Sequence, residues 1–90
     1  MPVTKRVLFY GKVQGVYFRR RTFDSASESG VTGWVRNLPD GSVEAEFSGD
    51  TEKVESVIDY CSNRMPVARV DRVEVTDLDY VEHSGFRIKY

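Results

Sequence analysis

The order of two hydrophobic periodicities along the chain constrains its fold more than any other feature of the sequence. Stretches whose apolar residues alternate, as in strands, are interrupted twice by stretches whose apolar residues recur every three or four positions, as in helices. The predicted order is therefore strand, helix, strand, strand, helix, strand, strand. The expected strands cover residues 5–13, 31–37, 42–47, 70–76 and 86–90, and the expected helices cover residues 18–29 and 50–65.

This order is typical of an α+β sandwich of ferredoxin-like type, β-α-β-β-α-β, with an extra C-terminal strand. We expect two helices on one face of a mixed, mainly antiparallel sheet. A chain of 90 residues encloses one core, so we expect a single domain over residues 1–90. A strand–helix–strand unit returns the chain in the same direction. The first two strands should therefore end at the same edge of the sheet, with the last strand ending nearby.

The apolar pattern also predicts finer features of the strands and turns. Residues 5–13 carry apolar side chains on both faces, which indicates a central strand, whereas the third strand should be buried on one side only. Residues 38–41, Leu-Pro-Asp-Gly, predict a hairpin turn. Asp50 is expected to cap the second helix. Val70 and Val73 fall on opposite faces of the fourth strand, which predicts a bend or a late start.

The formal net charge is only −1, but the charged residues are unevenly distributed. Residues 1–23 contain six lysines and arginines and no acidic residue, whereas residues 40–60 contain seven acidic residues and one lysine. The N-terminal end can therefore attract an anion, while the rest of the surface repels polyanions. This distribution favours a small anionic ligand over a long nucleic acid.

Residues 11–20 place a glycine-containing loop directly before the first predicted helix. Such a loop directs several backbone N–H groups into one concavity, where the helix dipole adds partial positive charge. Gly15 lets a ligand approach the backbone without a side chain in the way. Arg19 is unfavourable beside this positive helix end unless an anion lies between them, so Arg19 is a candidate to bind phosphate oxygens in a bidentate manner. The alternative, a plain turn followed by a solvated basic face, stays open on this loop alone.

Three motifs in this chain resemble those of the acylphosphatase family. They are GKVQGVYFR, GWVRN and DGSVE, which occur in this order within residues 11–44. The family pattern is roughly G-x-V-Q-G-V-x-F-R, then G-W-V-x-N, then D-G-x-V-E, and the chain length and strand order match as well. The resemblance implies hydrolysis of the carboxyl–phosphate bond of acyl phosphates to a carboxylate and inorganic phosphate, with no metal and no organic cofactor.

The resemblance also assigns roles to individual residues. Arg19 would bind the phosphate, and Asn37 would position the attacking water. The backbone of the loop over residues 14–19 would hold the phosphate oxygens. The residues of this loop are Gln14, Gly15, Val16, Tyr17, Phe18 and Arg19.

The chemistry of an acyl phosphate needs few catalytic groups. Its leaving group is a carboxylate with a pKa of about 4, which departs without a proton donor. Phosphoryl transfer passes through a loose transition state, where catalysis is mostly positioning and charge stabilisation. The attacking water would give its proton to the phosphate or to solvent. A phosphomonoester, whose leaving group is an alkoxide, should therefore be a poor substrate.

Other polar residues receive structural interpretations from the sequence. His83 and Glu44 are expected on the surface, Cys61 in the core and Asp40 in the hairpin turn. Trp34 is expected to pack or to shape the site from the second strand.

Charged groups near the site are interpreted in the same way. Arg20 and Arg21 are expected to be solvated, and Arg36 should lie on the face opposite Asn37. A terminal carboxylate on Tyr90 would hold Arg19 ready in the empty site if it reached that side chain.

The sequence also bears on location and partners. No apolar run approaches the roughly 20 residues of a membrane span, and we expect no signal peptide and no membrane association. Cys61 is the only cysteine, which fits a reducing cytoplasm and excludes a multi-cysteine zinc site. We expect a monomer that binds a small acyl phosphate and no nucleic acid. The sequence reveals no acyl-recognition pocket and so leaves the physiological substrate open.

Three alternative functions share parts of this pattern. An RNA-recognition module shares the β-α-β-β-α-β order, but the pI of about 5.8 and the outward acids Glu44 and Glu46 on the third strand count against it. A phosphate or acyl-phosphate sensor would share the fold. It would need Arg19 but not a water-positioning Asn37. A domain that works within a larger assembly would have the same sequence features.

Overall fold

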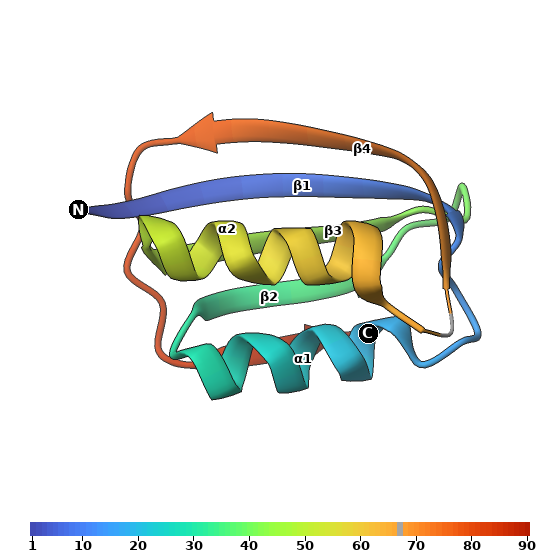
Figure 1. Ribbon diagram of the computed structural model, residues 1–90, viewed down its shortest axis with the longest axis horizontal. Helices are drawn as coiled ribbons and strands as arrows, with labels where there is room; N and C mark the ends of the chain where they lie inside the picture. Colours follow the sequence, from blue (N-terminus) through green and yellow to red (C-terminus); the bar gives the residue numbers. More distant parts are fainter. Residues whose placement is uncertain (67) are drawn as a thin grey trace.

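The described residues of the computed structural model, 1–66 and 68–90, form a two-layer structure in which two α-helices cover one face of a five-stranded sheet (Figure 1). The predicted order of elements is confirmed, with boundaries that shift by a few residues. The elements are β1 (Pro2–Lys12), α1 (Phe18–Ser29), β2 (Thr32–Asn37), β3 (Val43–Asp50), α2 (Thr51–Asp59), the π-helical turn η1 (Tyr60–Arg64), β4 (Arg69–Leu78) and β5 (Phe86–Lys89).

The strand order in the sheet is β4-β1-β3-β2-β5. The pairs β1–β3, β1–β4 and β2–β3 are antiparallel, and β2–β5 is parallel. β1 and β2 therefore run in the same direction with β3 between them, as the strand–helix–strand argument predicts. The fold is confirmed as ferredoxin-like α+β with an extra strand, β5, added beside β2.

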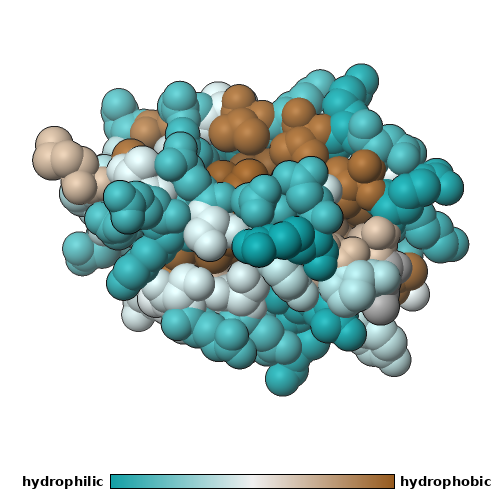
Figure 2. Space-filling view, in the orientation of Figure 1, coloured by the Kyte–Doolittle hydropathy of each residue, from teal (hydrophilic) through white to brown (hydrophobic). Residues whose placement is uncertain are grey.

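The core lies between the helices and the sheet. α1 buries Phe18, Thr22 and Ala26 and ends at Gly30, whose φ of 73° is left-handed, as expected for a helix C-terminus. Phe9 packs against Phe18 with ring centroids 5.1 Å apart. The surface seen from the helix side is mostly hydrophilic, with apolar residues exposed between α2 and β4 (Figure 2). The core is therefore well covered between α1 and the inner strands, but it is less completely covered near β4.

The second face of β3 is covered, which the sequence pattern did not predict. Glu46 and Ser48 are 4% and 0% exposed, so the expectation that this strand is buried on one side only was wrong. β4 and β5 lie at opposite edges of the sheet, and the connection over residues 79–85 crosses the face that the helices leave open. It is fixed there by Val81, whose N–H donates to Thr4 Oγ1 at 2.8 Å, and Thr4 in turn lies 2.6 Å from Ser48 Oγ.

Glu46 is the centre of a polar cluster beneath this connection. Its carboxylate accepts a hydrogen bond from Arg6 Nη2 at 2.9 Å and lies 2.7 Å from His83 Nε2. His83 was expected on the surface, but its side chain is only 21% exposed because it turns inward to Glu46. Burial by itself would raise the pKa of Glu46, but the hydrogen bonds and positive charges of Arg6 and His83 outweigh burial and hold the pKa below its usual value.

Two further details differ from the expectations or refine them. Asp50 occupies the N-cap position of α2, but its side chain makes no capping hydrogen bond. The irregularity predicted in the fourth strand is a register shift, in which Tyr10 pairs with Arg72 and Gly11 pairs with Val70. A Cβ atom at Gly11 would lie 2.3 Å from the Arg69 carbonyl oxygen, so this bulge requires glycine.

Candidate active site

A cavity of about 550 Å³ lies at the edge of the sheet where β2 ends and α1 begins. It brings together Arg19 at the beginning of α1 and Asn37 at the end of β2, as the topology predicted. Three of the loop residues assigned to phosphate binding also line the cavity, in addition to Arg19. The lining residues are Val13, Gly15, Tyr17, Phe18, Arg19, Arg20, Asn37, Ile88 and Tyr90.

Arg19 brings uncompensated positive charge to this cavity. It forms no ion pair with any residue that the structure describes, whereas the adjacent Arg20 pairs with Asp24 at 3.3 Å. The Arg19 guanidinium carbon instead lies 5.0 Å from the centroid of the Tyr90 ring. The ring of Tyr90, rather than its carboxylate, therefore contacts Arg19. A guanidinium that lacks a carboxylate partner in a cavity is available to an anion.

The N-terminus of α1 adds hydrogen-bond donors beside Arg19. Tyr17 occupies the N-cap position with a φ of 61°, makes no side-chain cap, and no acidic residue lies in the first turn. Arg21 N–H donates to the Tyr17 carbonyl at 3.0 Å, so the N–H groups before Arg21 lack intrahelical partners. Gly15 has a φ of 73°, and a Cβ there would meet nothing within 4 Å, so the loop leaves open space for a ligand.

The other loop residues hold the loop in place through their side chains. Gln14 Nε2 donates to the carbonyls of Leu38 at 2.8 Å and Ser42 at 2.9 Å, which ties the loop to the hairpin directly after Asn37. Val16 packs against the core, and the side chain of Phe18 is buried. Neither Gln14 nor Val16 lines the cavity, and because both side chains are engaged elsewhere, only their backbone N–H groups would be left to contact a phosphate.

Asn37 presents an unpaired hydrogen-bond acceptor. Its Oδ1 atom is buried and has no hydrogen-bond partner among the residues that the structure describes. A buried acceptor without a partner is destabilising by about 1–3 kcal/mol, so its retention calls for an explanation. A water molecule or ligand in the cavity would satisfy this atom. The sequence identified Asn37 through its motif, but the missing partner is visible only in the structure.

The remaining polar candidates lie away from the cavity. Cys61 is fully buried, and burial raises the pKa of its thiol to about 12, despite a hydrogen bond with Thr22 that acts in the opposite direction. Hydrogen bonds from the Ser42 side chain and backbone lower the pKa of Asp40, which lies in the hairpin turn as expected. Trp34 was expected to pack or to shape the site, but it does not line this cavity and instead lies between the cations of Arg36 and Lys89.

The described ranges, 1–66 and 68–90, bear on metal binding and membrane spanning as well. They hold no group of three or more His, Cys, Asp or Glu side chains arranged to bind a metal ion. Among the helices of these same ranges, none is both long and apolar enough to cross a membrane.

The fold and the cavity define a class of protein: a small ferredoxin-like α+β domain with an arginine-lined cavity between a glycine-containing loop and a strand end. The family model for acylphosphatase matches residues 5–88. An acylphosphatase of Thermoplasma volcanium is 53% identical over 89 residues, covering 99% of each chain. An acylphosphatase of Pelotomaculum thermopropionicum is 51% identical over 85 residues, covering 93% of this chain and 92% of that protein.

Solved structures agree with these relatives. The crystal structure of acylphosphatase from Bacillus subtilis superposes with a TM-score of 0.92 at 32% identity and covers 98% of this chain and 99% of that one. The chain belongs to the acylphosphatase family. The resemblance seen in the three sequence motifs is thereby confirmed.

Proposed function

We propose that this chain, as a single domain over residues 1–90, hydrolyses the carboxyl–phosphate bond of acyl phosphates with Arg19 and the 14–19 loop amides binding the phosphate and Asn37 positioning the water. Membership of the acylphosphatase family supports the activity. The observation that carries the residue roles is that Arg19 and Asn37 line one cavity, and that neither the Arg19 guanidinium has an ion-pair partner nor Asn37 Oδ1 a hydrogen-bond partner among the residues that the structure describes.

Phosphate binding uses charge that is already in place. The guanidinium of Arg19 and the backbone N–H groups of the loop and of the first turn of α1 neutralise the equatorial oxygens of the phosphoryl group. Arg19 beside the positive end of α1 is an unfavourable arrangement in the free protein. A bound phosphate between them removes this repulsion, so the site is complementary to an anion before the substrate arrives.

Attack on phosphorus needs an oriented water. Asn37 Oδ1 accepts a hydrogen bond from this water and directs its lone pair at the phosphorus atom. The phosphorus–oxygen bond to the carboxyl group breaks, and the carboxylate leaves with the bonding electron pair. The proton of the water passes to the phosphate or to solvent, and inorganic phosphate is released. Because the leaving carboxylate is weakly basic, neither a general acid nor a metal ion is required.

The same features define the partners that we propose. All proposed groups come from one chain, which is consistent with a monomer that acts on a small molecule. Residues 79–85 cover part of the open sheet face, and Glu44 lies on this face, so it is a poor platform for nucleic acid. Cys61 is buried and not in a disulfide, which is consistent with a protein that acts in the reducing cytoplasm.

The test is hydrolysis of benzoyl phosphate with a chelator present, by the wild type and by Asn37→Ala, together with inhibition of both by inorganic phosphate. We expect kcat of Asn37→Ala to fall on the order of 10²- to 10³-fold. Inhibition by phosphate should change little, because Arg19 and the loop remain. Arg36→Ala is the matched control, since Arg36 is next in sequence but lies on the other face of β2 against Trp34.

Two results would contradict the proposal. A wild type that binds phosphate without turnover would favour a sensor. A rate that is lost with chelator would show that a metal ion is needed.

A further inference from the structure

We propose that the rings of Tyr17 and Tyr90, at the rim of the cavity, bind the acyl group of the substrate and favour acyl phosphates whose acyl group is planar and apolar. Such groups are aromatic or conjugated, in contrast to a short alkyl group such as acetyl. The inference rests on the proposed function, because it takes the phosphate to be held by Arg19 and the loop.

The geometry of phosphoryl transfer sets the direction of the acyl group. The attacking and leaving oxygens lie roughly in line through phosphorus. A water held by Asn37 at the end of β2 therefore places the leaving carboxylate on the opposite side of the phosphate. The most exposed side chains of the cavity are Tyr17, which is 79% exposed, and Tyr90, which is 99% exposed. A leaving group that extends out of the cavity therefore passes these two rings.

The cavity has room for more than a phosphate. Its volume of about 550 Å³ falls in the range of sites that enclose a small organic ligand. The apolar lining residues Val13, Phe18 and Ile88 lie in the same cavity. The space beyond the phosphate thus has an apolar floor and an aromatic rim, which suits a flat carbon skeleton.

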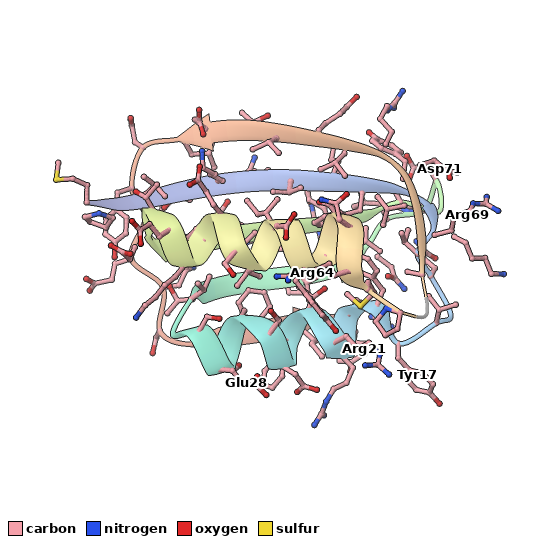
Figure 3. All side chains as sticks on the ribbon, viewed as in Figure 1. Tyr17, Arg21, Glu28, Arg64, Arg69 and Asp71 are labelled. Atoms are coloured by element: carbon pink, nitrogen blue, oxygen red, sulfur yellow. The ribbon has the colours of Figure 1, made fainter. Side chains whose placement is uncertain are left out.

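Tyr17 occupies a position where folding alone would favour another residue. It is the only non-glycine residue with a positive φ among those that the structure describes. A left-handed conformation is unfavourable for an L-residue with a bulky side chain, and glycine or asparagine would adopt it more easily. The Tyr17 side chain also projects into solvent from the beginning of α1 (Figure 3). Neither feature stabilises the folded chain, but both place an aromatic ring at the mouth of the cavity.

Tyr90 places a second ring beside the phosphate site. Its ring centroid lies 5.0 Å from the Arg19 guanidinium carbon, which places the ring beside the group that would bind the phosphate. Its almost complete exposure leaves most of the ring surface free. An aromatic acyl group in this position would gain stacking interactions with the ring in addition to the burial of its apolar surface.

A negatively charged acyl group is the main alternative, and Arg20 would be its partner. Arg20 lines the rim, but its charge is directed elsewhere. Its Nε lies 3.3 Å from Asp24 Oδ1, and its guanidinium carbon lies 5.7 Å from the centroid of the Phe23 ring. The rim therefore offers two free aromatic rings and one cation that already has a carboxylate partner.

The test compares kcat/KM for benzoyl phosphate and acetyl phosphate, as a ratio, in the wild type and variants. The intrinsic reactivity of each substrate is the same for every enzyme, so a change in the ratio isolates contacts with the acyl group. We expect the ratio to fall about three- to tenfold in Tyr17→Gly and in Tyr90→Leu, and to be retained in Tyr17→Phe and Tyr90→Phe. Tyr80→Leu is the matched control, since Tyr80 is an exposed tyrosine outside the cavity.

Folding is monitored by the thermal midpoint, which should stay equal or rise in Tyr17→Gly as the left-handed strain is relieved. A ratio unchanged in both Tyr17→Gly and Tyr90→Leu would overturn the inference while leaving the proposed function intact. Faster turnover of glutaryl phosphate than of benzoyl phosphate, lost in Arg20→Gln, would overturn it in favour of an anionic acyl group. Absence of turnover of any acyl phosphate by the wild type would overturn the proposed function and this inference with it.

Discussion

The cavity and the sheet face covered by residues 79–85 differ in whether their polar side chains have partners. Beneath residues 79–85, the polar side chains are paired: Thr4 lies 2.6 Å from Ser48, and Glu46 contacts both Arg6 and His83. In the cavity, Arg19 has no ion-pair partner and Asn37 Oδ1 no hydrogen-bond partner among the residues described. Paired buried groups stabilise the fold, whereas the groups without partners in the cavity remain available to bind a ligand. Substitutions in the two regions should therefore separate activity from stability.

Arg19→Ala should have the largest effect. We expect kcat/KM for benzoyl phosphate to fall on the order of 10³-fold or more, because a guanidinium that stabilises a phosphoryl transition state contributes this much. The free energy of unfolding should stay the same or rise by about 0.3–1 kcal/mol, because a cation is removed from the positive end of α1. Steady-state kinetics and urea unfolding measure the two quantities.

Arg21→Ala is the control for this variant. Arg21 is exposed on the same helix and does not line the cavity (Figure 3). Its kcat/KM should stay within about twofold of the wild type, as for surface substitutions away from a site. An equal loss of activity in both variants would mean that general positive charge, rather than Arg19 itself, binds the substrate.

Gln14→Leu should affect both properties, because Gln14 connects the loop to the hairpin that follows Asn37. Loss of its two hydrogen bonds to Leu38 and Ser42 should lower the free energy of unfolding by about 1–3 kcal/mol. Displacement of the loop relative to Asn37 should lower kcat by about 10- to 100-fold. A variant that loses stability but keeps full kcat would show that the loop position does not depend on this contact.

Glu46→Gln should reduce stability and leave activity intact. The charged hydrogen bonds to Arg6 and His83 should make the loss about 1–3 kcal/mol in chemical denaturation. Glu44→Gln is the matched control on the same strand, since Glu44 pairs with the half-exposed Arg36 and should contribute about 1 kcal/mol or less. A kcat/KM more than about twofold below that of the wild type in Glu46→Gln would contradict the separation of the two regions.

The free energy of unfolding should depend on pH through the cluster of Glu46, Arg6 and His83. The folded-state pKa of Glu46 lies below its usual value of 4.5, so the unfolded chain binds protons more readily. The stability that this depression contributes is present above about pH 4.5 and is lost as the pH falls through the folded-state pKa. Unfolding measured from pH 6 to pH 3 should show a shallower loss for Glu46→Gln than for the wild type. Identical slopes would argue against the cluster.

The smallest expected effect is at Cys61, whose thiol should not react with a thiol reagent in the native protein. Its thiol is fully buried and its pKa is raised to about 12, so almost no thiolate exists at pH 8. A thiol reagent should label the native protein only as fast as it unfolds. Rapid labelling at pH 8 in native buffer would show that the core opens beside α1.

The sequence predicted the parts of the molecule that depend on periodicity and chain direction. Helix 18–29 is confirmed at both ends, and the convergence of Arg19 and Asn37 follows from the strand–helix–strand rule. The register shift at Asp71 agrees with the irregularity that the sequence predicted as a bend or a late start, because a phase change in alternation has few structural outcomes.

The sequence could not predict contacts made by irregular segments. Residues 79–85 have no periodicity that specifies which face they cross, so the burial of Glu46 and the inward turn of His83 were missed. The sequence did not reveal the two hydrogen bonds of the Gln14 side chain for a related reason. Its partners are backbone carbonyls, 24 and 28 residues away, which carry no mark in the sequence.

The most direct test of the contrast between the two regions is a titration of the isotopically labelled protein with inorganic phosphate, followed by amide chemical shifts. We expect the largest shifts at Gly15 to Arg20 and at the side-chain amide of Asn37, with little change at Glu46 or His83. Arg19→Ala should abolish these shifts at the same phosphate concentrations. Shifts centred elsewhere on the protein, or shifts that persist in Arg19→Ala, would contradict the assignment of the cavity as the phosphate site.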